Sequence, residues 1–133
     1  MNKIQKAADI IQEIIYINIA SVTPDGLPWN TPVYSAYSDR LDFFWHSWKE
    51  NQHSINVAHN PNVFVTIYDS TAPEGTGWGV YFQGTVEVIT SGLDLVNGLR
   101  LMYLRKNKKI KAIDFFLTKF PRRVYKFLLK RFG

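Results

Sequence analysis

The stretch that decides the fold covers residues 41–69 and reads LDFFWHSWKENQHSINVAHNPNVFVTIYD. Its first block, residues 41–46, alternates aromatic with polar residues, which is typical of a strand. Asn60-Pro61 ends the middle block, because a residue that precedes proline is pushed out of the helical region. The last block has an apolar residue at every second position: Val63, Val65 and Ile67. The stretch therefore predicts a strand, a tight loop, a short helix and another strand.

The start of the predicted short helix is a candidate anion site. Ser47-x-x-Glu50 matches a capping box, so we expect the helix to begin there. Backbone N–H groups and a partial positive charge at a helix N-terminus favour a bound anion. Lys49 stands at this terminus, with Ser47, Asn51 and His53 as further donors. The alternative interpretation is an ordinary capped helix with a solvated lysine.

The N-terminal third predicts a helix followed by a hairpin. Residues 2–13 carry apolar positions at helical spacing, and residues 14–22 form a β-branched run that we expect to be covered on both sides. Thr23-Pro24-Asp25-Gly26 predicts a turn, because proline presets φ and glycine accepts positive φ. Residues 28–37 read as the next strand. Pro32 lies inside it and predicts an edge, a bulge or a ligand-facing break.

The C-terminal half predicts a strand, helices and a closing strand. Residues 80–88 form a strand in which Gly84 suggests a bulge. Residues 91–106 form a helix with one apolar face, made by Leu95, Leu99, Met102 and Tyr103. Residues 113–120 are a shorter helical candidate. Residues 121–129 fit either an alternating strand or an amphipathic helix, and we predict a strand. The whole chain is expected to be one mainly β domain with flanking helices (α+β), spanning residues 1–133 as a small barrel.

Composition limits the functional classes. The 133 residues are 46% hydrophobic and 20% charged, which is normal for a soluble globular protein, and they include no cysteine. The sequence has no membrane-length apolar run and no signal-peptide core at its N-terminus, so a cytoplasmic location is the expectation. The formal charge is +5. Basic residues crowd the last quarter, which could serve nucleic acid, an anionic cofactor or a membrane surface, or be a solvated face.

Motifs for hydrolytic or metal chemistry are missing from the sequence. It has no G-x-S-x-G, Walker-type, G-x-G-x-x-G or H-E-x-x-H pattern. His46, His53 and His59 are close in sequence, but no carboxylate lies at a convincing ligand spacing. We therefore expect no metal site.

The order of elements resembles the pyridoxamine-5'-phosphate-oxidase-like family. The resemblance rests on Gly26-Leu-Pro-Trp-Asn-Thr-Pro-Val33, on the strand at residues 41–46, on the helix ending in Asn60-Pro61, and on residues 80–88 with Gln83-Gly84-Thr-Val-Glu. Residues 91–129, with Pro-Arg-Arg-Val-Tyr, match more loosely. Members of this family are split β-barrels that bind FMN and usually form homodimers. The resemblance thus implies a split β-barrel of the FMN-binding type, a homodimer with flavin at its interface, and a small-molecule substrate.

The resemblance also implies where the cofactor lies. Backbone groups of one strand would edge the isoalloxazine ring: Asn30, Thr31, Pro32 and Val33. The ribityl side would be lined by Trp45, His46 and Ser47. The phosphate would be held by Lys49 and Asn51, with Gln52 or His53. Trp78 and Gly79 of the other subunit would complete the ring pocket, and Trp29, Trp45 and Trp78 would surround the ring.

Two departures argue against a true pyridoxamine phosphate oxidase. The arginine and lysine that stand near the flavin in those enzymes correspond here to Thr31 and Ala36, and their substrate-binding arginines are not clearly matched. We therefore expect a flavin-dependent oxidoreductase of another substrate. The alternatives are a deazaflavin-dependent reductase, a flavin-binding module without turnover, and a basic nucleic-acid-binding barrel with aromatic stacking faces. Partners other than a second copy and a small molecule are not expected, neither nucleic acid nor membrane.

Overall fold

The sheet is antiparallel throughout and has the strand order β2-β1-β5-β6-β7-β4-β3 in the computed structural model, which describes residues 2–106 and 122–132. The strands are β1 (Tyr16–Val22), β2 (Pro28–Tyr34), β3 (Ala36–Tyr37), β4 (Phe43–Trp48), β5 (Asn62–Tyr68), β6 (Gly79–Ile89) and β7 (Arg122–Phe132). The helices are α1 (Lys3–Glu13), α2 (Gln52–His59) and α3 (Gly92–Lys106). Strands β2 and β3 end the sheet and do not pair with each other in the described residues. This open sheet with flanking helices confirms the predicted split barrel.

The turn of the first hairpin forms as the sequence predicts, but the single strand predicted over residues 28–37 is wrong. The strand breaks at Ser35, whose amide and hydroxyl both donate to the Ile15 carbonyl, and β2 and β3 lie at opposite edges of the sheet. Asn2 caps α1 by accepting a hydrogen bond from the Gln5 amide over 2.8 Å. Gly26 adopts a φ of 89°, and its amide donates to the Thr23 carbonyl, which closes the turn between β1 and β2. Strand β2 is an edge strand, so Pro32 removes no inner ladder bond and the edge prediction is confirmed.

Strand β1 differs from the prediction of cover on both sides. Ile17 and Ile19 are buried, whereas the alternating Tyr16 and Ala20 are exposed in the single chain. Buried and less buried residues alternate along β1 with a period of two. This alternation is not evident in the sequence, because Ile14 and Ile15 precede the strand and do not belong to it.

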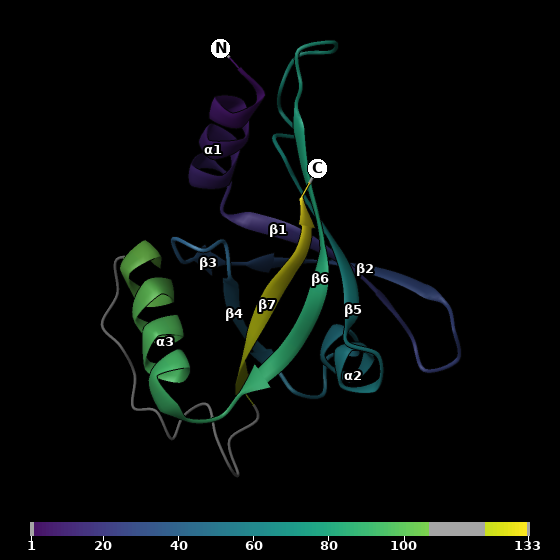
Figure 1. The fold of residues 1–133 in the computed structure, drawn as a ribbon. Coiled ribbons are helices and arrows are strands. Elements are labelled where there is room, and N and C mark those ends of the chain that lie inside the picture. The colour runs from purple at the N-terminus through teal and green to yellow at the C-terminus, as the bar shows by residue number, and fades with distance from the viewer. Residues whose placement is uncertain (1, 107–121, 133) are drawn as a thin grey trace.

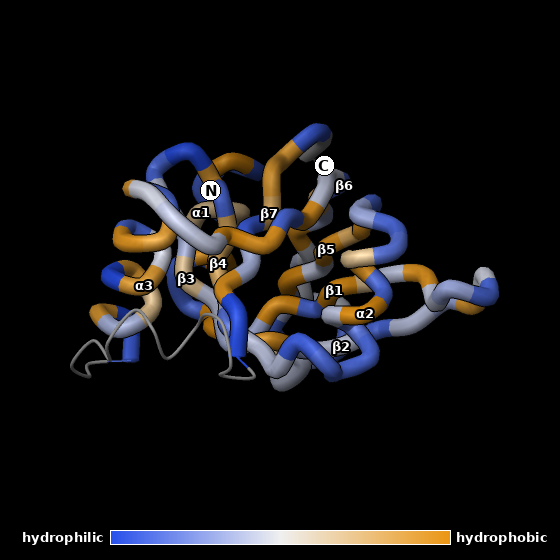
Figure 2. Tube along the Cα trace, turned by 90° about the horizontal axis from the view of Figure 1, so that it is seen from below, coloured by the Kyte–Doolittle hydropathy of each residue, from blue (hydrophilic) through white to orange (hydrophobic). Residues whose placement is uncertain are grey.

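Two apolar clusters occupy opposite faces of the sheet. The larger lies inside the barrel and includes Ile17, Val65, Phe82 and Phe127, all essentially fully buried. The smaller lies between the sheet and α3, and the four residues predicted for the apolar face of this helix, Leu95, Leu99, Met102 and Tyr103, are all in it. Figure 2 shows hydrophobic stretches following β1, β5 and β7 through the molecule.

Strand β7 closes the sheet between β6 and β4 and confirms the strand predicted near the C-terminus. A bulge between Gln83 and Gly84 shifts its register against β6, as expected. Gly84 is required there, because a Cβ would collide with the Leu128 carbonyl oxygen and the Phe127 ring. The helix predicted at residues 113–120 lies outside the described residues.

The helices of the described residues occupy different parts of the barrel surface (Figure 1). Helix α1 packs on β5 and β6, and α2 packs on β1, β2 and β6. Helix α3 covers β3, β4 and β7. In Figure 1, α1 and α2 lie at opposite ends of the sheet, so residues near these two helices are far apart in one chain.

Candidate functional site

The end of β4 and the first turn of α2 meet through a buried hydrogen bond. Ser47 Oγ lies 2.9 Å from His53 Nε2, and the two residues are only 8% and 9% exposed. Burial lowers the pKa of the His53 imidazole, which therefore favours the neutral form. A neutral His53 can accept the Ser47 hydroxyl proton or donate to the hydroxyl oxygen, according to its tautomer.

Helix α2 begins four residues later than the capping box predicts. Its N-cap is Asn51, which makes no side-chain capping bond. The capping-box prediction is wrong because β4 continues to Trp48 by pairing with β7, where Ser47 stands opposite Arg123, and the Ser47 hydroxyl contacts His53. The Asn51 amide donates to the Trp48 carbonyl over 3.1 Å and closes the intervening turn. The first turn of α2 thus presents backbone donors that no side chain of its cap satisfies.

Lys49 and Gln52 flank this helix start in different ways. Lys49 lies exposed in the turn after β4. Gln52 is half-buried, and its Nε2 donates to Asn56 Oδ1 over 2.7 Å. Asn56 in turn donates to Ser21 Oγ of β1 over 3.0 Å. No local sequence pattern points to Ser21 and Asn56, because their hydrogen bond depends on α2 packing onto β1.

Trp45 and His46 point to opposite faces of β4. The Trp45 side chain is 1% exposed and stacks on Tyr125 in the barrel core, so its ring offers no surface to a ligand. His46 faces α3, where its Nε2 lies 2.8 Å from Lys106 Nζ and its Nδ1 lies 3.2 Å from an Arg122 guanidinium nitrogen. Its ring also stacks on Tyr103. The three predicted ribityl neighbours therefore do not present their side chains to one surface.

Strand β2 presents Asn30 and Pro32 to solvent and turns Val33 into the barrel core. Thr31 is half-buried and accepts a 2.9 Å hydrogen bond from the indole of Trp29. Since α2 packs on β2, this edge strand and the α2 start belong to one region of the chain.

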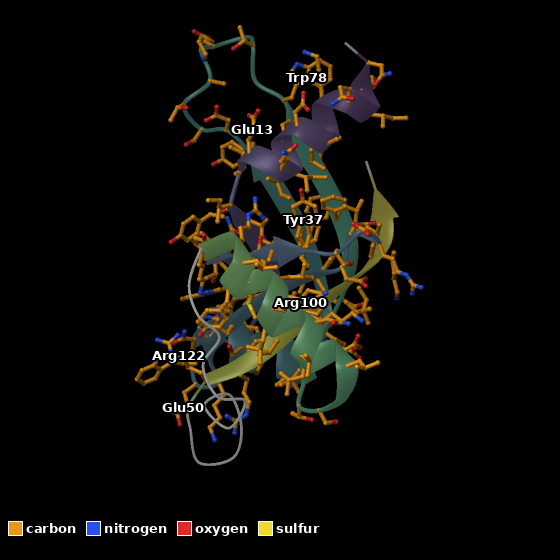
Figure 3. All side chains as sticks on the ribbon, turned by 90° about the vertical axis from the view of Figure 1, so that its left-hand side faces the viewer. Glu13, Tyr37, Glu50, Trp78, Arg100 and Arg122 are labelled. Atoms are coloured by element: carbon orange, nitrogen blue, oxygen red, sulfur yellow. The ribbon has the colours of Figure 1, made fainter. Side chains whose placement is uncertain are left out.

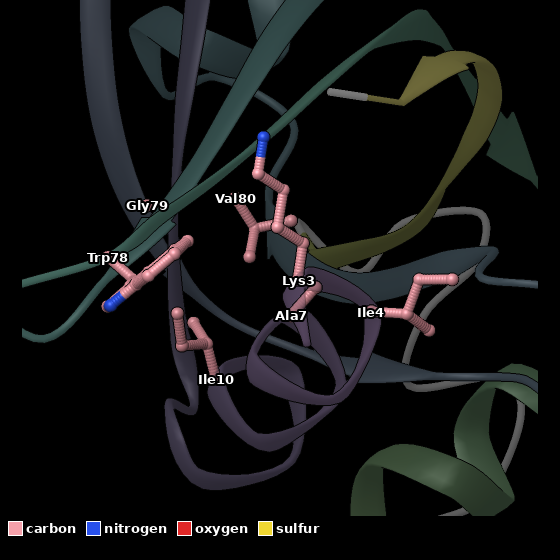
Figure 4. Close-up of a pocket in the computed structure, with 7 residues that line it drawn as sticks. All are labelled: Lys3, Ile4, Ala7, Ile10, Trp78, Gly79 and Val80. Carbon is pink, nitrogen blue, oxygen red and sulfur yellow. The ribbon is translucent and has the colours of Figure 1, made fainter. Parts of the chain in front are cut away.

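Trp78 and Gly79 lie in a second region, beside α1. With Ile4, Ala7, Ile10, Lys3 and Val80 they line a cavity of about 290 Å³ (Figure 4). Trp78 is 44% exposed, and Lys6 Nζ lies 4.4 Å from the centroid of its ring. Figure 3 shows Trp78 and Glu50 at opposite ends of the molecule. One chain does not bring Trp78 to the start of α2.

Two other features are absent from the described residues. Across residues 2–106 and 122–132, no group of three or more His, Cys, Asp or Glu side chains is arranged to hold a metal ion. None of the helices described there is long and apolar enough to cross a membrane.

Comparison with solved structures identifies several with this fold. A conserved hypothetical protein from Mycobacterium tuberculosis has a TM-score of 0.77 and 20% identity, over 99% of this chain and 82% of that one. The heme storage protein HutZ from Vibrio cholerae gives 0.82 and 15%, over 98% and 92%. An F420 reductase gives 0.66 and 18%, over 94% of each chain. At these identities the likeness concerns the fold alone.

Sequence comparison assigns the family. None of the curated proteins compared with the chain matches it. Residues 4–125, which are most of the chain, match the family described as pyridoxamine 5'-phosphate oxidase. Together with the open antiparallel barrel and its neighbours of the same fold, this match identifies the chain as a member of the pyridoxamine 5'-phosphate oxidase-like family.

Proposed function

We propose that the chain binds FMN and acts as a flavin-dependent oxidoreductase on a small molecule other than pyridoxamine phosphate. The observation that carries this proposal is the start of α2, where Asn51 makes no side-chain cap and Lys49 lies in the preceding turn. Bound FMN would supply the redox chemistry, so the protein needs to provide position and electrostatics rather than a catalytic triad.

The residues at the α2 start suit a phosphate. Its first backbone N–H groups lack intrahelical acceptors, and the helix dipole adds partial positive charge. Lys49 adds a full positive charge, and the Ser47–His53 pair supplies a polar wall. Glu50 is adjacent and negative, and because Glu50 and Lys49 are both exposed, solvent screens both charges alike. The backbone N–H groups and the helix dipole therefore tip the site towards an anion with several acceptor oxygens.

The ring of FMN fits best along β2. This strand is an edge of the sheet and packs near α2, and Asn30 and Pro32 are exposed on it. An edge strand offers backbone N–H and C=O groups to a planar heterocycle. Trp45 is excluded from ring contact by its burial, so it supports the site by filling the barrel behind Ser47.

A homodimer would bring Trp78 to the flavin of a second copy. The distance between Trp78 and Glu50 within one chain supports this arrangement, since a single chain leaves the two regions apart (Figure 3). The exposed outer face of the sheet supports pairing as well, because aromatic residues gather on it: Tyr16, Phe64, Tyr68 and Tyr81. Apolar patches of this kind on a small domain favour association.

Two of the three histidines are poorly placed to bind heme, the group that the HutZ neighbour is named for storing. Both ring nitrogens of His46 lie against cationic side chains, and Nε2 of His53 is engaged by Ser47. His59 is exposed, but it lies in the last turn of α2 and not at the α2 start. A heme held by histidine at the α2 start is therefore disfavoured. A deazaflavin cofactor also carries phosphate, so the α2 start suits it too. The absorption spectrum and the FMN titration described next distinguish the two cofactors.

The test is the ultraviolet-visible spectrum of the purified protein, followed by titration of the apo-protein with FMN. A flavin spectrum and saturable quenching of FMN fluorescence support the proposal. Anaerobic bleaching by NADPH or NADH then separates an oxidoreductase from a flavin-binding module without turnover. Protein that takes up no FMN at micromolar concentration would contradict the proposal.

A further inference from the structure

Arg123 of β7 lies next to the proposed phosphate site although it is far from it in sequence. In the ladder between β4 and β7, Arg123 stands directly opposite Ser47. Side chains of directly opposite residues lie on the same face of an antiparallel sheet, with their Cβ atoms about 5 Å apart. The Ser47 hydroxyl is bonded to His53 in the first turn of α2. Arg123 therefore shares its face of the sheet with the α2 start.

Neighbouring contacts confirm this assignment of faces. Trp45 and Tyr125 are each two positions from Ser47 and Arg123 on the same strands, and they stack on each other inside the barrel. Arg122, the adjacent residue, points to the other face, where its guanidinium contacts His46 Nδ1 and lies 6.0 Å from the centroid of the Trp48 ring. The two consecutive arginines thus serve different faces of β7.

A buried hydroxyl in the first turn of α2 connects this helix to β7 near Arg123. Ser54 is 2% exposed and interacts with the phenol of Tyr125, which is two positions from Arg123 along β7. Burial raises the pKa of the Tyr125 phenol, and Ser54 and Arg123 lower it to a smaller extent. Tyr125 therefore has both the first turn of α2 and Arg123 close to it.

We propose that Arg123 is a second cation, beside Lys49, that binds the phosphate of FMN, which makes β7 part of the cofactor site. This inference rests on the proposed function. One guanidinium nitrogen of Arg123 donates to the Arg122 carbonyl over 2.8 Å, which restrains the side chain. A guanidinium has five N–H donors in a planar fork that matches phosphate, so it can bind phosphate and keep this bond.

The experiment titrates apo-protein with FMN and with riboflavin, which has the same ring and lacks the phosphate. Arg123→Gln is compared with Arg123→Lys, which keeps the charge, and with Lys130→Gln, which removes a charge from an exposed position of the same strand. We expect Arg123→Gln to weaken FMN binding at least ~10-fold, the scale of one charge-assisted contact, with riboflavin binding unchanged. Arg123→Lys should recover part of the loss, and Lys130→Gln should bind FMN like the wild type.

The outcomes separate the inference from the function beneath it. Wild-type protein that binds no FMN contradicts the proposed function, and the inference falls with it. Wild-type protein that binds FMN while folded Arg123→Gln binds it equally well contradicts the inference alone. Equal losses for FMN and riboflavin would also overturn it, because they would show damage to the barrel rather than a lost phosphate contact. Circular dichroism of each variant supplies the check on folding.

Discussion

The guanidinium of Arg105, in the last turn of α3, donates to the Gln12 carbonyl at the end of α1 over 3.0 Å. The same nitrogen lies 3.3 Å from the carbonyls of Ile11 and Ile14, and the other terminal nitrogen donates to the Ser35 carbonyl over 3.1 Å. One side chain thus satisfies the C-terminal carbonyls of α1 and the break between β2 and β3.

Arg105→Met should therefore destabilise the fold. The change leaves partly buried carbonyls without donors, which costs about 2 kcal/mol of the free energy of unfolding. Arg100→Met, at an exposed position of the same helix, should cost less than about 0.5 kcal/mol. Urea denaturation followed by circular dichroism measures both changes. Equal midpoints for Arg105→Met and the wild type would show that the hydrogen bonds of Arg105 to these carbonyls do not stabilise the fold.

Lys49→Glu should weaken FMN binding by about 1.5 kcal/mol or more, since it replaces an attractive charge at the α2 start with a repulsive one. Riboflavin binding should change little, because riboflavin carries no phosphate. Fluorescence quenching of both ligands measures the difference. As a control, Lys130→Glu makes the same charge reversal on a distant part of β7. Unchanged FMN affinity in Lys49→Glu would show that Lys49 does not contribute to the phosphate site.

His53 should make folding stability depend on pH. Burial lowers its pKa in the folded protein below the usual 6.5, so the unfolded chain binds this proton more readily. Above pH 6.5 His53 is neutral in both states and makes its full contribution to folding stability. As the pH falls from 6.5 towards the lower pKa of the folded state, the unfolded chain takes up the proton first and the folded state loses stability. We expect His53→Gln to lose less stability than the wild type between pH 7 and pH 5, as measured by urea denaturation at each pH. His59→Gln, at an exposed position at the end of α2, should follow the wild type.

The sequence predicts the elements well where one local cause decides them. Asn60-Pro61 ends α2 as expected, and Asn60 is its C-cap. The apolar stripe of α3 is buried residue for residue, because a helical period of 3.6 needs no knowledge of the partner surface. Pro32 is also predicted correctly as an edge residue. Proline has no backbone N–H to donate to a neighbouring strand, so it is disfavoured in an inner strand of any sheet.

The sequence predicts the candidate site less well, because its residues depend on contacts between distant segments. Ser47 matches a cap by local pattern, but pairing with Arg123 keeps it in β4 and moves the helix start to Asn51. Strand alternation shows that Trp45 and His46 face opposite sides. Only the position of α3 shows that the Trp45 side is the barrel core.

The protein should be a homodimer at micromolar concentration. Phe64 lies on the exposed outer face of the sheet, with its ring centroid 6.2 Å from that of Tyr81. A glutamate there would place a charge in an apolar interface, so Phe64→Glu should shift the protein towards monomer. Leu93→Glu changes another exposed apolar residue, at the start of α3, and should remain dimeric. Light scattering that finds monomeric wild type with flavin bound would contradict the shared site.

Any redox turnover should occur at the flavin without a histidine acting as acid or base. His46 has a cationic side chain against each ring nitrogen, so it is poorly placed to exchange a proton with a substrate. His46→Ala should therefore keep its rate of flavin reduction within a factor of roughly 3, well below the ~100-fold that general acid–base catalysis contributes. His53→Ala should bind FMN less tightly, because it removes the partner of Ser47, and should be reduced at a similar rate once it is saturated.

Anaerobic stopped-flow reduction of bound FMN by NADPH or NADH measures these rates in the wild type and both variants. Each is run at full flavin occupancy, so that weaker binding does not count as slower chemistry. A chelator should leave the rates unchanged, since the described residues gather no metal ligands. A ~100-fold loss in either variant at full occupancy would assign that histidine an acid–base role. If neither nicotinamide reduces the wild type, the same Lys49 and α2 contacts would serve a flavin that is bound without turnover.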